Sequence, residues 1–152
     1  MKSLIAGLAT AALLLVSCNK SGDKTGGNHH EDGDSISQDA NRALYDQVMD
    51  LHDEVMPKME DLYNLKKELL GKIAKTPGIA PSSKKEIENI VAGLDSANKA
   101  MMDWMHDFKP LPSTADQEKA REYLENEMES IKKVRDLTNE TLEKARAIKE
   151  KK

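Results

Sequence analysis

Methionine and histidine side chains gather in two short segments of this chain, residues 52–59 (HDEVMPKM) and residues 100–108 (AMMDWMHDF). Thioether sulfur and imidazole nitrogen together favour a soft ion such as Cu(I) or Ag(I). An indole ring beside such an ion can cover it through a cation–π contact. The residues that would form this site are His52, Met56, Met59, Met101 and Met105, with Trp104 as the cover. The two segments therefore carry a candidate soft-metal site, provided that the fold brings them together.

A helical hairpin would bring these segments to the same level. Prolines and a glycine between residues 77 and 82 predict a turn, which places His52 opposite residue 107 on an antiparallel neighbour. A second turn at residues 110–113 would bring residues 118–123 alongside the same layer. Six of the eight methionines belong to the predicted layer: Met49, Met56, Met59, Met101, Met102 and Met105.

Three interpretations of the methionine layer remain open. Methionine is an ordinary filler of irregular gaps in a core, and a kink at Pro57 would create such a gap. The layer could instead line a groove for a partner, or it could bind Cu(I) or Ag(I). The helical period turns His52 inward but leaves His106 in solvent, so core packing is the favoured interpretation.

The N-terminal residues have the pattern of an export signal. A lysine is followed by an apolar run, residues 4–16, that is too short to span a bilayer, and Leu15–Cys18 closes the run. This pattern resembles the lipobox of bacterial lipoproteins, in which the cysteine becomes an acylated first residue after cleavage. The resemblance implies a signal peptide over residues 1–17, a cut between Ser17 and Cys18, and a lipid such as palmitate on Cys18.

The segment that follows is predicted to be a flexible tether over residues 18–36. Residues 19–34 contain no large apolar side chain and carry four glycines, so ordering them would bury too little surface to offset the entropy cost. His29 and His30 are adjacent on this segment and would be weak metal ligands. This segment is therefore predicted to be a hydrophilic spacer and not a metal site.

From residue 37 onward, apolar residues recur at spacings of three and four, which is the helical period. The breaks between them predict helices at about residues 37–76, 83–109 and 114–150, with a capping box at Ser83 and Glu86 opening the second. No segment alternates with a strand-like period. The predicted fold class is all-α, an antiparallel three-helix bundle with long helices over residues 37–152.

Composition narrows the function classes. The chain has one cysteine, no glycine-rich phosphate loop and no HExxH motif, so the sequence predicts a protein that is not an enzyme. The net charge is −4, and acidic and basic residues are interleaved, which argues against binding to nucleic acid. Interleaved charges are typical of solvated helix faces.

Two segments, YDQVMDLHDEVMPKM (45–59) and MMDWMHDF (101–108), are similar to a group of small helical lipoproteins from Bacteroidota. Some members carry the label "viral A-type inclusion protein". The resemblance implies a helical fold and an envelope localisation, and it transfers no activity and no site. Residues 19–22 lack the acidic cluster of a surface-export signal in this phylum and the aspartate that retains lipoproteins in the inner membrane of enteric bacteria. The outer membrane, facing the periplasm, is therefore the predicted location.

These observations predict a lipid-anchored, non-enzymatic interaction or structural protein of the envelope, whose partner is an envelope protein that the sequence does not name. The alternative is a periplasmic Cu(I) or Ag(I) binder that uses the methionine layer. A third candidate is a peptidoglycan tether through the C-terminal lysine, because a lipidated cysteine, a long helix and a terminal lysine also resemble the murein lipoprotein.

Overall fold

The structure, a computed structural model, describes residues 31–112 and 114–151. It consists of four helices: α1 (Glu31–Val55), α2 (Lys58–Lys75), α3 (Pro81–Asp107) and α4 (Gln117–Glu150). The residues so described include no strand. Within those ranges, no helix combines the length and the apolar character that a bilayer crossing requires.

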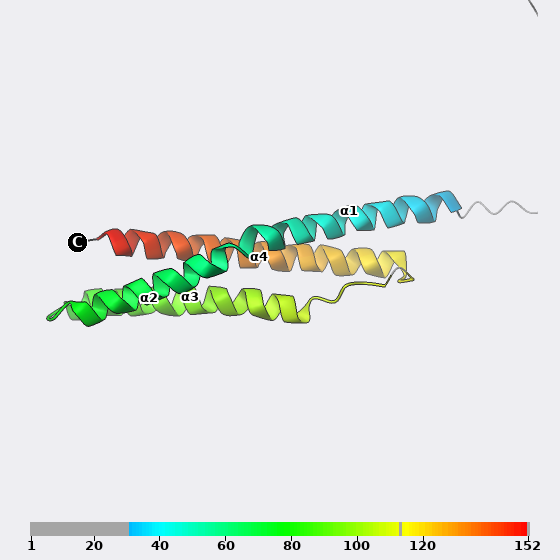
Figure 1. The fold of residues 1–152 in the computed structure, drawn as a ribbon. Coiled ribbons are helices and arrows are strands. Elements are labelled where there is room, and N and C mark those ends of the chain that lie inside the picture. The colour runs from blue at the N-terminus through cyan, green and yellow to red at the C-terminus, as the bar shows by residue number, and fades with distance from the viewer. Residues whose placement is uncertain (1–30, 113, 152) are drawn as a thin grey trace, which may run out of the picture.

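The helices α1 and α2 are two arms of the first predicted helix, bent at Pro57. The Met56 N–H still donates to the His52 carbonyl at 2.9 Å, and Pro57 keeps a helical backbone (φ −61°, ψ −26°). Because proline has no N–H, the carbonyl of Asp53 loses its helical donor, and the Met59 N–H instead reaches the Met56 carbonyl at 3.2 Å. Pro57 is exposed. The predicted kink, with its ring outside the core, is confirmed, and Figure 1 shows the change of direction.

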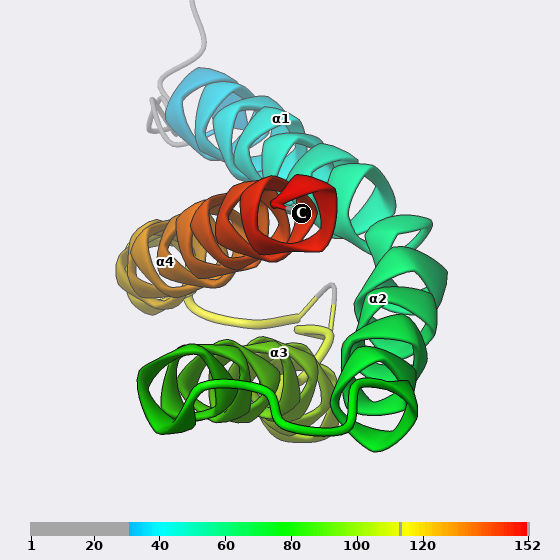
Figure 2. The same ribbon diagram turned by 90° about the vertical axis from the view of Figure 1, so that its left-hand side faces the viewer.

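The three long segments form an antiparallel bundle. The α1–α2 segment and α4 run in the same direction, and α3 runs in the opposite direction (Figure 1). The helix α4 packs against all the others, with α1 along its N-terminal half and α2 along its C-terminal half. Seen along the bundle, α1, α2 and α3 surround α4 on one side and leave the other side of the α3–α4 pair open (Figure 2). The predicted all-α fold is confirmed.

Two helix starts differ from the prediction. The helix α3 begins at Pro81, whose fixed φ suits the first helical position, and no described side chain caps it. The predicted capping box of Ser83 and Glu86 is therefore wrong. The helix α4 begins at Gln117 rather than near residue 114, because Asp116 Oδ1 accepts a hydrogen bond from the Lys119 N–H at 3.0 Å and forms the N-cap.

The helix α1 begins at Glu31, inside the segment predicted as a tether (residues 18–36). Residues 1–30 lie outside the described residues, and with them the signal peptide, Ser17, Cys18 and the pair His29 and His30. The helix α2 ends at Lys75, and Gly78 takes a positive φ of 79° in the turn that follows, which glycine adopts without strain.

The linker between α3 and α4 changes the predicted register. Phe108 leaves α3 in an extended conformation (φ −60°, ψ 123°), and the Lys109 N–H donates to Tyr123 Oη at 2.7 Å. An extended residue advances about 3.3 Å, against about 1.5 Å in a helix, so α4 starts well beyond the end of α3 (Figure 1). The prediction that residues 118–123 lie beside the methionine layer is wrong. Their place is taken by residues roughly two helical turns further along α4, which include Met128.

The interior divides into two cores. We call the first the aliphatic core; its buried residues are Leu62, Leu65, Leu69, Ile87, Leu94, Ala97, Leu142, Ala145 and Ile148. We call the second the mixed core; its buried residues are Val48, Val55, Met101, Trp104, Met128, Ile131 and Val134. The aliphatic core lies where α2, α3 and α4 meet, and the mixed core lies where α1, α3 and α4 meet.

Candidate functional site

The mixed core contains three of the six methionines of the predicted layer, Met59, Met101 and Met105, together with Trp104. Met101 is fully buried, and Trp104 is 6% exposed. Met59 and Met105 are half-buried and pack against the same core. The structure therefore brings these four side chains together from α2 and α3, as the helical hairpin predicts.

His52 faces α3, but at a different level from the predicted one. Its ring centroid lies 5.9 Å from that of Trp104, so it meets Trp104 rather than residue 107. Its Nδ1 atom lies 2.8 Å from Asp53 Oδ1 on the same helix. His106 is exposed, as predicted, with Nδ1 3.0 Å from Asp107 Oδ1.

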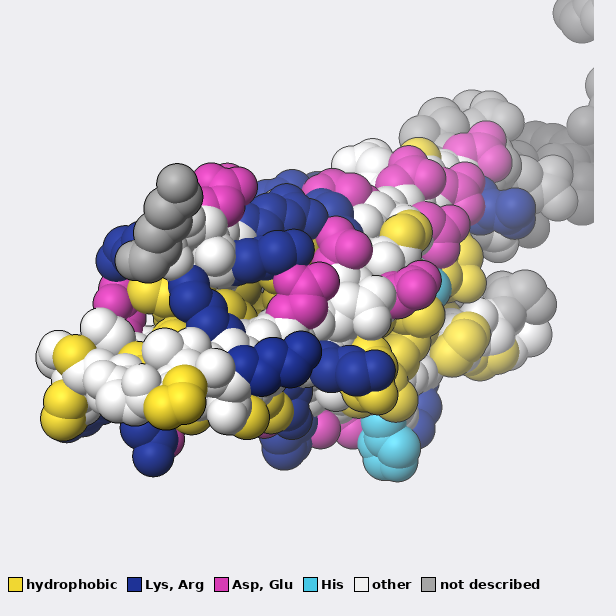
Figure 3. Space-filling view, turned by 60° about the vertical axis from the view of Figure 1, so that its left-hand side comes forward, with side chains coloured by type: hydrophobic (Ala, Val, Ile, Leu, Met, Phe, Trp, Pro, Cys, Tyr) yellow, Lys and Arg dark blue, Asp and Glu magenta, His cyan; other side chains and the backbone are white. Residues whose placement is uncertain are grey.

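Met56 and Met102 do not join the layer. Met56 is 37% exposed at the bend between α1 and α2, and Met102 is 52% exposed on α3. Neither packs against the aliphatic or the mixed core. Figure 3 shows one face of the bundle, on which apolar side chains reach the surface beside a histidine. Of the five predicted metal ligands, Met56 is thus the one that points away from the others.

A row of aromatic rings that the sequence did not predict lies along one end of the mixed core. Trp104 stacks on Phe108 at a centroid distance of 5.0 Å, and Phe108 lies 6.1 Å from both Tyr45 and Tyr123. Tyr45 comes from α1 and Tyr123 from α4, so the row ties three helices together. The available signal was the scarcity of aromatics, 3% of residues, combined with two of them in residues 104–108.

Tyr123 is the group of this row with a shifted pKa. Burial raises the pKa of its hydroxyl, the hydrogen bond from the Lys109 N–H lowers it, and the nearby Glu127 carboxylate raises it again. The net direction is upward. The neutral phenol is therefore the form that holds the linker between α3 and α4 in place.

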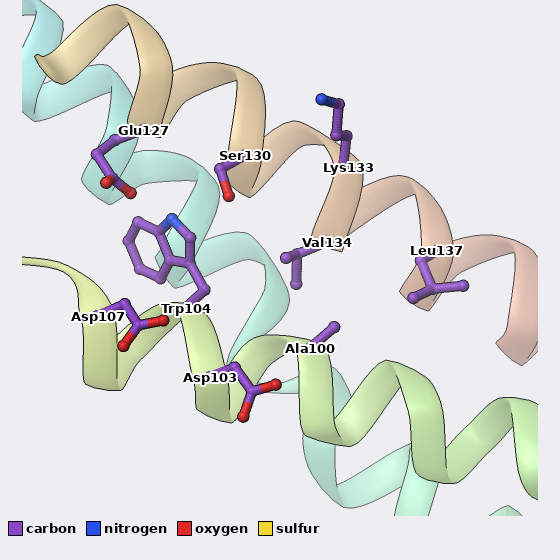
Figure 4. A pocket seen from close by; sticks show the side chains of 9 residues that line it. All are labelled: Ala100, Asp103, Trp104, Asp107, Glu127, Ser130, Lys133, Val134 and Leu137. Atoms are coloured by element: carbon purple, nitrogen blue, oxygen red, sulfur yellow. The ribbon is translucent and has the colours of Figure 1, made fainter.

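A groove of about 460 Å³ lies between α3 and α4 beside Trp104 (Figure 4). Its lining residues are Ala100, Asp103, Trp104, Asp107, Glu127, Ser130, Lys133, Val134 and Leu137. The indole nitrogen of Trp104 points toward α4, between Glu127 and Ser130 (Figure 4). It is buried and has no hydrogen-bond partner among the described residues. The sequence placed Trp104 as a metal cover and did not predict this groove.

The charged groups around the groove are mostly acidic. Asp103 and Asp107 stand on α3 and Glu127 on α4. The one basic lining residue, Lys133, is engaged with Glu129 at 2.6 Å, and that ion pair lowers the pKa of Glu129. The local balance along the groove is therefore negative.

The geometry of the mixed core supports a soft-metal site in one respect and opposes it in others. Met59, Met101 and Met105 share one core with Trp104, but Met101 is buried to the same extent as any packed side chain. Within residues 31–112 and 114–151, no group of three or more histidine, cysteine, aspartate or glutamate side chains is placed to hold an ion. Any soft-metal site would therefore depend on thioether sulfur, with His52 as the nitrogen ligand.

Comparison of the chain with protein-family models, with characterised proteins and with solved structures returned no match.

Proposed function

We propose that this protein is a lipid-anchored, non-enzymatic interaction or structural protein of the bacterial envelope. The single observation that carries the proposal is the sequence Leu15–Cys18 after a short apolar run. Acyl chains on Cys18 would each contribute about 0.8 kcal/mol per buried methylene, and more than one chain is needed for stable anchoring. The lipid thus supplies the membrane affinity, and the helical domain supplies the contacts.

The helical domain is suited to making contacts with another protein. Its surface combines ion pairs along the helices with a groove that exposes apolar atoms beside carboxylates. Apolar surface rimmed by polar groups is typical of protein interaction sites. The proposed location is the periplasmic face of the outer membrane, because residues 19–22, which follow Cys18, lack the signals for surface export and for retention in the inner membrane.

The anchor is tested by the variant Cys18→Ala with metabolic labelling by a palmitate analogue. We expect the label to be lost and the protein to stay uncleaved or to become soluble, because removing the acyl chains removes nearly all the membrane affinity. The matched control is Ser17→Ala, which keeps a small residue before the cut and should keep the label. A Cys18→Ala protein that is labelled as strongly as the wild type would end the lipoprotein proposal.

The interaction role is tested by cross-linking intact cells and isolating the protein from the envelope. We expect a discrete protein partner that is recovered with the wild type and lost with Cys18→Ala, because the anchor sets the location. Recovery of peptidoglycan fragments alone would favour the tether instead. Recovery of neither would contradict the interaction proposal.

Soft-metal binding is a second candidate, favoured by the gathering of Met59, Met101, Met105 and Trp104 in one core. Anaerobic titration with Cu(I) tests it, because Trp104 is the only tryptophan and reports on that core. The interaction proposal predicts neither a fluorescence change nor a shift in melting temperature. Quenching that disappears in the double variant Met59→Leu, Met105→Leu would establish the metal candidate instead.

A further inference from the structure

We infer that the groove between α3 and α4 binds a basic amphipathic helix of a partner protein, with Trp104 at its centre. The inference rests on the proposed interaction function and names the surface and the chemistry of the partner. Three features of the groove carry it: an apolar floor, an indole N–H that lacks an acceptor, and a rim of carboxylates.

The floor of the groove is apolar and continuous along the helix pair. Ala100, Val134 and Leu137 line it next to Trp104, and Leu137 is 37% exposed. Leu137 also lines a second hollow of about 300 Å³, which continues toward Asn89 and Gly93. From Asn89 to Asp107 the α3 side of this surface spans roughly 27 Å, at about 1.5 Å per helical residue. That length suits a helix, which docks in such grooves through its apolar face.

The indole N–H of Trp104 lacks a hydrogen-bond acceptor, which a bound partner could supply. A buried donor without an acceptor is costly, and native structures pair nearly all such groups. Glu127 and Ser130 flank the nitrogen in Figure 4, yet neither accepts its proton. Both side chains are only half-buried, so an incoming segment can displace one of them and offer a carbonyl or hydroxyl oxygen to the N–H.

The charge of the rim selects the partner. Asp103 forms an ion pair with Lys99 on its own helix, whereas Asp107 contacts His106 and its side chain is 80% exposed, so Asp107 can meet a cation from outside. Glu127 takes part in no ion pair among the described residues, and Lys133 is turned to Glu129. Lysine or arginine side chains fit this rim, because their methylene stems cover apolar surface while the charged group reaches a carboxylate. An acidic or neutral helix would leave Asp107 and Glu127 without a lysine or arginine partner.

The experiment uses the full chain in detergent and a labelled peptide amide of about 18 residues, with leucine on one helical face and lysine on its flanks. Fluorescence anisotropy measures binding, and the emission of Trp104 shows where the peptide binds. We expect the lysine peptide to bind and to shift the Trp104 emission. The same peptide with glutamate in place of lysine should bind at least about tenfold more weakly.

Variants separate the groove from general electrostatic attraction. The double variant Asp107→Asn, Glu127→Gln removes two groove carboxylates that have no lysine or arginine partner among the described residues, and it should bind the lysine peptide about tenfold more weakly. The matched control, Asp50→Asn with Glu60→Gln, removes two exposed carboxylates outside the groove and should bind as the wild type does. Trp104→Phe should weaken binding, because the indole is lost from the centre of the groove, and its melting temperature measures separately the cost of the smaller ring in the core.

Three results would overturn the inference. The first is a lysine peptide that leaves the Trp104 emission unchanged. The second is an equal loss of affinity in the control variant, because the peptide would then respond to the net charge of the protein and not to the groove. The third is self-association of the chain that the groove variant abolishes, since the occupant would then be a second copy. The variant Cys18→Ala should bind the peptide as the wild type does. If the wild type is labelled with palmitate but does not bind the lysine peptide, the groove inference is contradicted and the lipid-anchor proposal is not.

Discussion

The two cores of the bundle differ in kind. The aliphatic core joins α2, α3 and α4 through leucine, isoleucine and alanine side chains that have no polar atoms to satisfy. The mixed core joins α1, α3 and α4 through methionine, an indole and β-branched residues, with half-buried His52 at its edge. The bend at Pro57 marks the change from one to the other along the first two helices.

The difference between the two cores indicates which part of the bundle supplies stability and which part supplies binding. Side chains with few rotamers and no polar atoms specify a rigid core, whereas methionine fills irregular space and adapts to new neighbours. The mixed core also carries the orphaned indole N–H and faces the groove. We therefore expect the aliphatic half to supply most of the stability and the mixed half to supply the centre of the binding surface, around Trp104.

The largest expected effect is in the aliphatic core. Leu94→Ala should lower the free energy of unfolding by about 2–5 kcal/mol, because Leu94 is 1% exposed and its removal leaves a cavity. The same substitution at the half-buried Leu44, which packs against the mixed core, should cost about half as much. Chemical denaturation of both variants measures the difference. Equal losses at the two positions would break the comparison.

A smaller and opposite effect is expected where the halves meet on α4. Thr138 is fully buried, and its Oγ1 atom has no hydrogen-bond partner among the described residues. Thr138→Val should therefore raise the free energy of unfolding by about 1 kcal/mol, since it removes an unsatisfied polar atom at similar shape. Ser96→Ala provides a control, because Ser96 Oγ already donates to the Ala92 carbonyl at 2.9 Å at an exposed site. A melting temperature that falls in Thr138→Val would show that the hydroxyl is satisfied in solution.

The methionines of the mixed half should tolerate leucine. Met101→Leu should change the stability by less than about 1.5 kcal/mol, because volume is nearly conserved in a core that adapts. Met56→Leu, at the exposed bend, should change it by less than about 0.5 kcal/mol. Thermal melts of the two variants check both values. A loss well above this limit at Met101 would mean that its sulfur, rather than its volume, matters.

The smallest effect is a pH dependence at Tyr123. Burial and Glu127 raise the pKa of Tyr123, so the folded protein disfavours the phenolate. The associated stability is fully present below the unfolded pKa of about 10 and is lost as the pH rises from there through the folded pKa. Tyr123→Phe should remove this part of the alkaline decline, as measured by denaturation between about pH 9 and pH 11. An identical alkaline decline in both proteins would contradict the assignment.

The sequence predicted the elements better than their relative positions. The helical period and Pro57 identified the helices and the bend, because both signals are local. The register of α3 against α4 depends on an extended linker fixed by Tyr123, which spacing alone does not show. The groove depends on that register, since Trp104 and Glu127 are distant in sequence. The capping error at Ser83 has a simpler reason, because Pro81 starts the helix two residues earlier.

The most direct test of this division is native-state hydrogen exchange on the full chain, free and with the lysine peptide. In the free protein, amides beside the aliphatic core, around residues 62–69 and 142–148, should be the most protected. With the peptide, protection should rise at residues 89–107 and 127–144, which line the groove and the hollow that continues it, and stay unchanged at residues 62–69. Equal protection of both halves in the free protein, or a rise confined to residues 62–69, would contradict the account.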